Sequence, residues 1–499
     1  MSEAIPGMQE APPPVEPRPA AVVVLVRMGP RGLETFWLRR ERTLSFAAGF
    51  YAFPGGRVDA ADAEVPVEGA APPDSALVVA AARELFEETG VLAARGRTPE
   101  APTLAAARQA LLDGRETFAS LLGRLGLQVD ALDFEPAGRW VTPPFMPVRF
   151  DARFFLVEVP PGTRAEVWPG EAAEGSWVRP ADALTLWQEG RALLHPPNRH
   201  ALNVLSRVRR TVDAVAWLAA PTAADTRIEF QRGVRLVALR TPTLLPATHT
   251  NCWILGTGEL LLVDPGASDP SEIERLVTHV RALTAEDCRP LAVVLTHHHL
   301  DHVGGARAVS EQLGIPVWCH ARTADRLPFR ADRLLGEGDE LVLAGAPGMR
   351  WRVLHTPGHA RGHLTLVDVA SRAAVVGDMT AGVGTILIDP PEGEMAEYLG
   401  QLARLRDLPV RAVYPAHGPP LPDGPSALAA VIEHRAMRER RVRAALGAAG
   451  RLLQDIAVEA YADTPTAHPY LAERSTLAIL EKLRGEGIAR ETAGAWSLA

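Results

Sequence analysis

Short apolar runs that end in histidine or aspartate recur in the second half of the chain. Residues 291–295 are Leu-Ala-Val-Val-Leu, and Thr-His-His-His-Leu-Asp-His follows at once over 296–302. Three more strand-like runs, at 352–354, 375–377 and 412–414, lead into loops that contain His359, Asp378 and His417. Apolar runs of this length predict strands, and loops at strand ends often carry function. The pattern therefore predicts one site built from several strand ends.

The motif at 296–302 has the spacing and the residue types of a metal site. His297 and His299 are two residues apart, so an extended backbone directs both side chains the same way. Asp301 and His302 follow where the chain turns, and they can address a second metal. Imidazole and carboxylate groups suit zinc, which keeps an open position for water in catalytic sites. The alternative is a run of exposed loop histidines, but the ligands supplied downstream favour a metal site.

Residues 240–420 resemble the metallo-beta-lactamase fold superfamily. Its signature is H-x-H-x-D-H, then a distant His, an Asp and a final His, and each element is present. The resemblance implies an αββα sandwich with two zinc ions, one held by His297, His299 and His359, the other by Asp301, His302 and His417, with Asp378 as the bridge and Asp301 also acting in catalysis. Zinc lowers the pKa of a bound water to about 7, which implies hydrolysis of a carbonyl or phosphoryl ester.

Two details of this predicted site stay open. Iron or manganese would also suit the ligand set, so the native metal is not fixed by the sequence. His363 follows the third histidine loop, where it would pack, orient a ligand or face the substrate. Packing or orienting a ligand is the favoured role.

A helical pattern in the first half of the chain sets three glutamates against an apolar face. Glu84, Glu87 and Glu88 share one face of a helix through their spacing, and the apolar residues of the opposite face are Val78, Ala82, Leu85 and Phe86. Like charges at these spacings repel one another, so a cation is a natural partner. Carboxylates suit Mg²⁺ or Mn²⁺, which in turn bind a diphosphate. The alternative is a solvated acidic face.

The stretch Arg-Glu-Leu-Phe-Glu-Glu-Thr-Gly-Val over 83–91 matches the core of the Nudix box. Together with Phe-Pro-Gly-Gly at 53–56, it makes residues 18–215 resemble the coenzyme A diphosphatase branch of the Nudix hydrolases. The resemblance implies an α/β/α sandwich with Mg²⁺ or Mn²⁺ held by Glu84, Glu87 and Glu88, and with Glu87 acting in catalysis. Ser75 stands where the full box has a glutamate that helps to hold the arginine. Arg83 therefore needs another partner, or the domain is a degenerate fold that only binds a nucleotide-like ligand.

The end of the chain predicts three helices, at 434–447, 452–461 and 475–487, and then a small hairpin. This order predicts a winged helix over 421–499, and it resembles the beta-lactamase-like protein 2 group, some members of which cleave single-stranded RNA. An RNA-binding face would use Arg435, Arg438, Arg440, Arg441 and Arg443. Glutamates interrupt that run, so a packing or dimer role is favoured over RNA binding.

Composition bounds the remaining questions. A chain of 499 residues predicts about three domains, and the net charge of −8 argues against general binding to phosphate backbones. The three cysteines have no paired spacing, which indicates a reducing compartment, and no apolar run approaches a membrane span. We expect a cytoplasmic protein, a homo-oligomer being possible, with a disordered arm at 1–17, a Nudix domain at 18–215, a linker at 216–235, a metallo-beta-lactamase fold at 236–420 and the winged helix at 421–499.

These features predict a bifunctional metal-dependent hydrolase. The central domain would cleave a thioester, lactone or phosphodiester, and the N-terminal domain would cleave a diphosphate linkage in a coenzyme A-like or nucleoside diphosphate-like substrate. Acyl-coenzyme A would serve both sites. The alternative is a single-strand endoribonuclease that uses the zinc pair and the winged helix, with the Nudix domain as a non-catalytic ligand sensor.

Overall fold

The computed structural model describes residues 12–41, 47–97, 99–168, 170 and 172–499. Residues 13–232 form one compact unit, and residues 233–499 belong to a second. The predicted arm at 1–17 lies outside the described residues up to residue 11, and residues 12–17 lead into the first strand without regular structure. Among the helices of the described residues, none has the length and apolarity needed to cross a bilayer.

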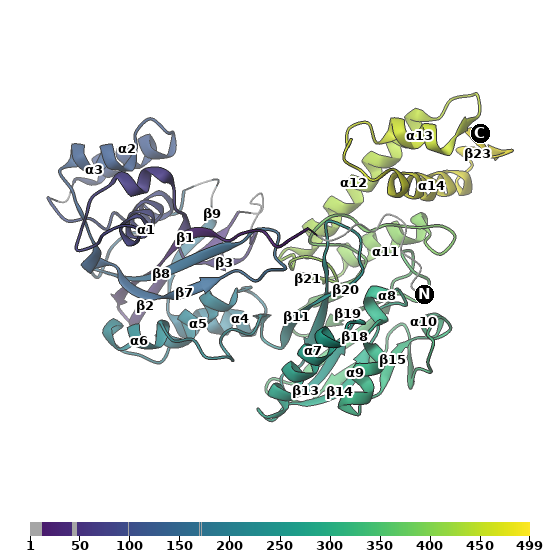
Figure 1. The fold of residues 1–499 in the computed structure, drawn as a ribbon, viewed down its shortest axis with the longest axis horizontal. Helices are drawn as coiled ribbons and strands as arrows, with labels where there is room; N and C mark the ends of the chain where they lie inside the picture. The colour runs from purple at the N-terminus through teal and green to yellow at the C-terminus, as the bar shows by residue number, and fades with distance from the viewer. Residues whose placement is uncertain (1–11, 42–46, 98, 169, 171) are drawn as a thin grey trace. The chain divides into compact units, whose positions relative to one another are not determined.

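A mixed sheet lies at the centre of the first unit (Figure 1). Its strands run in the order β3 (Tyr51–Ala52), β2 (Gly32–Arg40), β1 (Arg18–Gly29), β8 (Phe150–Val159) and β7 (Glu135–Val141), with β4 (Gly55–Arg57) on β1 and β9 (Ala172–Val178) on β2. β1 and β8 are parallel, and the neighbouring pairs are antiparallel. Because alternate residues of a strand face opposite sides, Val23 and Leu25 enter one core and Val24 and Val26 the other.

Helices cover both faces of this sheet, as predicted. One face packs against α1 (Asp74–Thr89), α2 (Ala101–Leu112) and α3 (Phe118–Leu125), the other against α4 (Pro180–Gln188), α5 (Pro196–Leu205) and α6 (Val215–Leu218). The apolar positions predicted for the glutamate-bearing helix α1 are buried, from Val78 to Phe86. Gly90 ends α1 in the left-handed conformation at φ 73°, and its N–H donates to the carbonyl of Phe86.

Short elements join these layers. They are the 3₁₀ helices at Ala60–Glu64, Ala131–Asp133 and Thr211–Asp213, the two-stranded sheet of β5 (Val67–Glu68) and β6 (Val129–Asp130), and β10 (Glu229–Gln231). The residues around β10 are fixed by α5, because the buried Arg199 guanidinium donates to the carbonyls of Ala224, Asp225 and Arg227 and pairs with Glu229 at 3.0 Å. Much of the stretch predicted as a linker therefore packs as part of the first unit.

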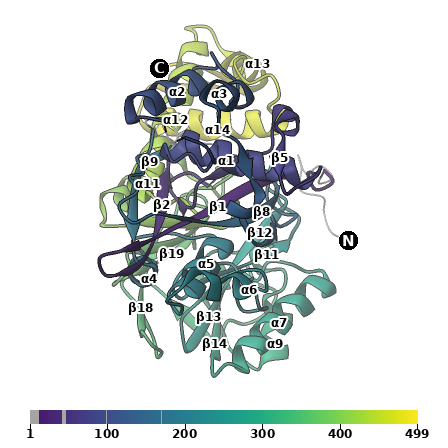
Figure 2. The same ribbon diagram turned by 90° about the vertical axis from the view of Figure 1, so that its left-hand side faces the viewer.

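Two sheets and their covering helices make up the body of the second unit. The first sheet runs β11 (Val234–Arg240), β12 (His249–Leu255), β13 (Glu259–Val263), β14 (Arg289–Val294), β15 (Val317–His320), β16 (Arg333–Leu335), and the second runs β17 (Glu340–Leu343), β18 (Met349–His355), β19 (Leu364–Asp368), β20 (Ala373–Gly377), β21 (Ala412–Pro415). Helices α7 (Pro270–Thr284) and α9 (Ala306–Leu313) lie against β13 and β14 of the first sheet (Figures 1 and 2). The second sheet is covered by α11 (Met395–Asp407) and α12 (Gly424–Ala445). The predicted αββα layering is observed.

The end of the chain extends this second layer of helices. After α12 come β22 (Arg451–Leu452), α13 (Leu453–Ala460), α14 (Pro469–Gly485), β23 (Ala489–Thr492) and β24 (Ala495–Leu498), and the last two strands form the predicted hairpin. α12 begins at Gly424 rather than at 434, because the Asp423 side chain caps the N–H of Ser426. Ile479 and Leu483 of α14 share one hydrophobic core with Tyr398 of α11. The tail is thus continuous with the sandwich.

Candidate functional site

All seven predicted ligands of the central site come together at one edge of the two sheets. They follow four strands: His297, His299, Asp301 and His302 after β14, His359 after β18, Asp378 after β20 and His417 after β21. They form three overlapping groups whose ligand atoms lie within 4.8 Å of one another: His297, His299 and His359; His297, His302 and Asp378; Asp301, His302 and His417. Two of the groups match the predicted sets, and the third places Asp378 between them.

Distances within the cluster fit two metal ions. His299 Nδ1 lies 2.9 Å from His297 Nε2 and 3.0 Å from His359 Nε2. Asp378 Oδ1 lies 3.5 Å from both His302 Nε2 and His417 Nε2, and its Oδ2 lies 3.4 Å from His359 Nε2. Ligands bound tetrahedrally at about 2.0–2.1 Å are separated from one another by roughly 3.3 Å. The carboxylate of Asp378 therefore lies close to both predicted ligand sets, as the predicted bridge would require.

Hydrogen bonds fix the rings of these histidines from behind. Nδ1 of His359 lies 2.8 Å from the carbonyl of Leu387, Nδ1 of His417 lies 3.1 Å from the carbonyl of His249, and Nδ1 of His302 lies 2.8 Å from Asp264 Oδ2. Because a carbonyl oxygen only accepts, Nδ1 of His359 and of His417 must donate, which leaves Nε2 with a lone pair directed into the cluster. The outer partners thus set the tautomer that a metal ligand needs.

The electrostatics of the cluster call for a cation. His302 Nε2 and Asp378 Oδ1 are buried and have no hydrogen-bond partner among the described residues. Burial by itself lowers the pKa of His302, but the Asp378 and Asp264 carboxylates raise that pKa well above its ordinary value. Burial lowers the pKa of His297, His299 and His359, so these rings are neutral ligands. These two atoms face each other at 3.5 Å, a metal pair would coordinate both, and the donor set suits zinc.

Asp264 supports the cluster from residues 262–266, a stretch whose sequence resembles the superfamily's loop beside the metals. It accepts from the Thr296 N–H at 2.7 Å and from the Thr296 hydroxyl at 2.6 Å, in addition to its contact with His302. The backbone of Gly266 lies against the backbone of the ligand loop. A Cβ at this position would lie 1.6 Å from the carbonyl oxygen of Asp301, so only glycine fits. The signal was the Asp-Pro-Gly that follows the apolar residues 260–263.

His363 orients the backbone at the bridging aspartate. Its ring is fully buried, Nδ1 lies 2.9 Å from the Thr356 hydroxyl, and Nε2 accepts from the Asp378 N–H at 3.0 Å. Burial lowers the pKa of His363 to about 3, so the ring is neutral and able to accept. Its contacts are those of an orienting residue.

In the first unit, Arg83 lies among the predicted glutamates of α1. Its Nη1 donates to Glu84 at 2.8 Å and to Glu87 at 3.2 Å, while Glu88 accepts from the Gly55 N–H at 2.8 Å. A Cβ at Gly56 would lie 2.4–2.6 Å from the Glu84 carboxylate, so only glycine allows this approach. The three glutamates share a face but form no closed three-ligand group among the described residues. Glu84 and Glu87 are partly exposed and Glu88 is buried, and carboxylates suit Mg²⁺, which keeps several of its waters.

Asp62 supplies the partner that Ser75 cannot give to Arg83. Its two carboxylate oxygens accept from Arg83 Nε and Nη2, each at 2.9 Å, and the two side chains are 2% and 9% exposed. Burial by itself lowers the pKa of Arg83, but the hydrogen bond to Asp62 and the charge of Glu84 raise it above its ordinary value. Sequence analysis missed Asp62, although an acidic residue six positions after Gly56 was the available signal.

Two of the five tail arginines considered for RNA binding are buried. Arg435 donates to the carbonyl of Ile386 and to the Thr385 hydroxyl, and Arg438 donates to the carbonyl of Ala460 at 3.0 Å and to Asp463 at 2.6 Å. Both side chains act in packing, which the sequence analysis favoured. Arg440, Arg441 and Arg443 are exposed.

Comparisons with known proteins cover both sites. A model of the metallo-beta-lactamase superfamily matches residues 245–417, and a model of the NUDT19 Nudix domain matches residues 64–205. A beta-lactamase-like protein 2 homolog of Caenorhabditis elegans is 29% identical over 245 residues, which are 48% of this chain and 80% of that protein. A hydroxyacylglutathione hydrolase of Xylella fastidiosa (strain M23) is 33% identical over 237 residues, 46% of this chain and 83% of that protein. An atrochrysone carboxyl ACP thioesterase of Aspergillus chevalieri is 29% identical over 252 residues, 48% of this chain and 76% of that protein.

Proposed function

Because the chain belongs to the metallo-beta-lactamase superfamily and carries a Nudix domain ahead of that fold, we propose that it is a hydrolase with two separate metal-dependent sites. The second unit would cleave a thioester, lactone or phosphodiester, and the first would cleave a diphosphate linkage. The observation that carries the proposal is the convergence of seven ligand side chains in three overlapping groups. Within these groups the buried His302 Nε2 and Asp378 Oδ1 form an ion pair at 3.5 Å rather than a hydrogen bond, and a bound cation would coordinate both atoms.

In the second unit, different residues would bind the two metals and act on the attacking water. His297, His299 and His359 would hold one zinc, Asp301, His302 and His417 the other, and Asp378 both. Zinc, when bound, would lower the pKa of a water molecule and polarise the ester oxygen. Asp301 is the least buried carboxylate of the predicted ligands, with a side chain 13% exposed, and it would accept a hydrogen bond from the attacking water. Asp264 and His363 keep His302 and Asp378 in place during turnover.

A thioester is the favoured substrate of this site. One relative is named a thioesterase and another a hydroxyacylglutathione hydrolase. RNA is less favoured because Arg435 and Arg438 are engaged inside the protein. We propose that the tail, residues 421–499, is a winged helix whose role is to pack against the sandwich.

In the first unit, Glu84, Glu87 and Glu88 would hold Mg²⁺ or Mn²⁺, and Glu87 would accept a proton from the attacking water. The Asp62–Arg83 pair restrains the guanidinium, whose Nη1 also donates to Glu84 and Glu87. Asp62 gives Arg83 the carboxylate partner that Ser75 cannot supply, and this supports a catalytic Nudix domain over a sensor that only binds its ligand.

Acyl-coenzyme A suits both sites in one cytoplasmic protein. The test incubates the intact chain with acyl-coenzyme A and follows free thiol and 4′-phosphopantetheine. We expect His297→Ala to abolish thiol release only, so that diphosphate cleavage in this variant yields S-acyl-4′-phosphopantetheine, and Glu87→Gln to abolish diphosphate cleavage only. Absence of both products from the wild-type protein would refute the proposal, and cleavage of a labelled oligoribonucleotide that His297→Ala abolishes would replace the thioesterase with an endoribonuclease.

A further inference from the structure

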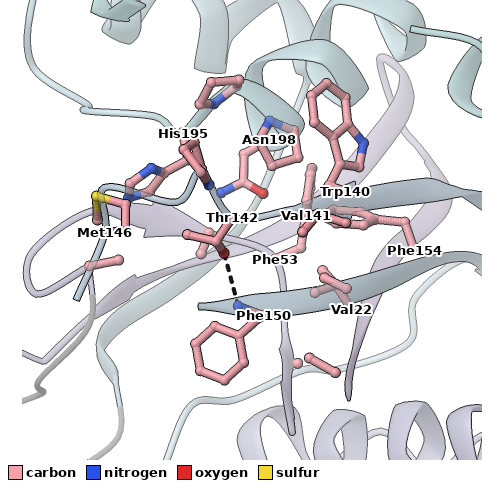
Figure 3. Close-up of a pocket in the computed structure, with 18 of the residues that line it drawn as sticks. Val22, Phe53, Trp140, Val141, Thr142, Met146, Phe150, Phe154, His195 and Asn198 are labelled. Atoms are coloured by element: carbon pink, nitrogen blue, oxygen red, sulfur yellow. Dashed lines mark hydrogen bonds between the residues drawn. The ribbon is translucent and has the colours of Figure 1, made fainter. Parts of the chain in front are cut away.

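The first unit contains a cavity of about 530 Å³ on the face of its sheet that α5 covers (Figure 3). Small-molecule pockets span about 300–1,000 Å³, so this one is large enough for a ligand. Its lining is mainly apolar and aromatic and includes Val22, Phe53, Trp140, Phe150 and Phe154. Among the described lining residues, the charged side chains are those of Arg40 and Arg139. Arg139 is already paired with Asp151 at 2.7 Å, so an apolar organic group suits such a lining.

The cavity adjoins the carboxylates of α1. Gly55 and Gly56 line it, and these two residues also meet Glu88 and Glu84, through the Gly55 N–H and through the space that a Gly56 Cβ would occupy. A diphosphate bound by a cation at Glu84 and Glu88 would therefore have one of its ester groups beside this cavity. The expected occupant of the cavity is therefore the organic group of the diphosphate substrate.

One wall of the cavity comes from the residues between α6 and the end of β10. Its lining residues are Pro221, Thr226, Ile228 and Phe230. Phe230 packs edge-on against Phe50, with ring centroids 5.6 Å apart, and its carbonyl accepts from the Leu194 N–H at 3.0 Å. We call residues 221–230 the cavity wall.

Helix α5 holds the cavity wall in place. Arg199 is 5% exposed, and its guanidinium donates to three carbonyls of the wall and pairs with Glu229. The neighbouring His200 lies 3.3 Å from Asp225. Asn198, one residue before Arg199, lines the cavity itself and donates to the carbonyl of Tyr51 at 3.2 Å. One helix thus presents a ligand-facing side chain and anchors the opposite wall.

We propose that the cavity wall, residues 221–230, determines the specificity of the first unit by enclosing an apolar group of its diphosphate substrate. The inference rests on the proposed diphosphatase function, but it adds a segment beyond the Nudix core that the reaction itself does not use. It follows that the first unit needs residues up to Phe230 to recognise its substrate.

The test reduces the cavity from its wall and measures binding and turnover separately. Ile228→Trp in the full chain places an indole in the cavity, and Val212→Trp, at a 66% exposed position outside the cavity lining, is the matched control. Binding is followed by the fluorescence of 1-anilinonaphthalene-8-sulfonate and by its displacement with coenzyme A, and turnover by release of 4′-phosphopantetheine. Thermal melting checks that each variant is folded.

We expect Ile228→Trp to weaken probe binding and to raise KM for coenzyme A at least about tenfold, since even one methylene in an apolar pocket changes binding by that factor. The value of kcat should stay within about twofold, and Val212→Trp should match the wild type. Equal probe binding and equal KM in Ile228→Trp and wild type would overturn the proposal. If Ile228→Trp lost displaceable probe binding while the wild type showed no turnover, the cavity wall would still bind a ligand, and the proposed diphosphatase function would be refuted instead.

Discussion

Removal of the Asp62 carboxylate tests how the Nudix domain functions without the usual glutamate. Asp62 makes two hydrogen bonds to Arg83, and a third from the Asp59 N–H at 2.8 Å, at a buried position. Removing one partner of a buried ion pair lowers the free energy of unfolding by about 3–5 kcal/mol, and we expect a loss of this size for Asp62→Ala. Asp62→Asn keeps the volume and one acceptor, so it should lose about 1.5–3 kcal/mol, the value of one charged hydrogen bond.

The same change should weaken cation binding. Without Asp62, the Arg83 guanidinium is held only by the carbonyl of Arg57 and by Glu84 and Glu87, so it competes more strongly for those carboxylates. We expect the Mg²⁺ concentration for half-maximal diphosphate hydrolysis to rise about tenfold in Asp62→Asn, a typical effect for a residue that orients metal ligands.

Hydrogen exchange with mass spectrometry measures the stability of α1 separately from that of the second unit. A Mg²⁺ titration of coenzyme A hydrolysis measures the Mg²⁺ concentration that gives half-maximal activity. Asp59→Asn is the matched control, because Asp59 is half exposed and lies 4.0 Å from Arg83 Nη2. An exposed pair contributes about 0–1 kcal/mol, so this control should stay close to the wild type. If Asp62→Asn and Asp59→Asn gave the same exchange rates and the same Mg²⁺ dependence, Asp62 would not be the partner of Arg83 that the structure indicates.

Other expectations concern the second unit and the metals. Asp264→Asn should lower thioester hydrolysis about 10–100-fold, because it loosens the ring of His302, and metal analysis should find less bound metal; normal activity with full metal would contradict this role. Arg435→Ala should slow the same reaction, because Arg435 holds the carbonyl of Ile386 next to the Leu387 carbonyl that orients His359, whereas Arg440→Ala, at an exposed position, should not. A chelator should stop both reactions, and Mg²⁺ alone should restore only diphosphate hydrolysis; recovery of both with Mg²⁺ would show that the central site does not need zinc.

The ligand cluster could be predicted because its residues follow short apolar strands. Each of His359, Asp378 and His417 stands just beyond a predicted strand, so sheet formation alone gathers them at an edge. The face of α1 could be predicted for a similar reason, since helical spacing places Glu84 and Glu87 together whatever the rest of the chain does. Local periodicity was sufficient in both cases.

Residues that act through long-range contacts could not be predicted in this way. Asp62 meets Arg83 across 21 residues, and Asp264 meets His302 across 38, with no periodic pattern to link them. The packing of residues 221–230 depends on Arg199 carrying its charge inside the fold, where it finds several acceptors at once. Residues 221–230 hold one proline, two alanines and mostly polar side chains, which give no sign of such an anchor, so this stretch was predicted to be a linker.

The metal content of the purified chain tests the central claim most directly. With Mg²⁺ removed, elemental analysis should find about two transition-metal ions per chain in the wild type, and Asp378→Ala should lose most of both because it contacts both sets of ligands. His355→Ala, a nearby histidine whose ring stacks on His320 outside the ligand groups, should keep the full content. A wild-type chain without bound metal, or an Asp378→Ala variant with as much metal as His355→Ala, would contradict the account.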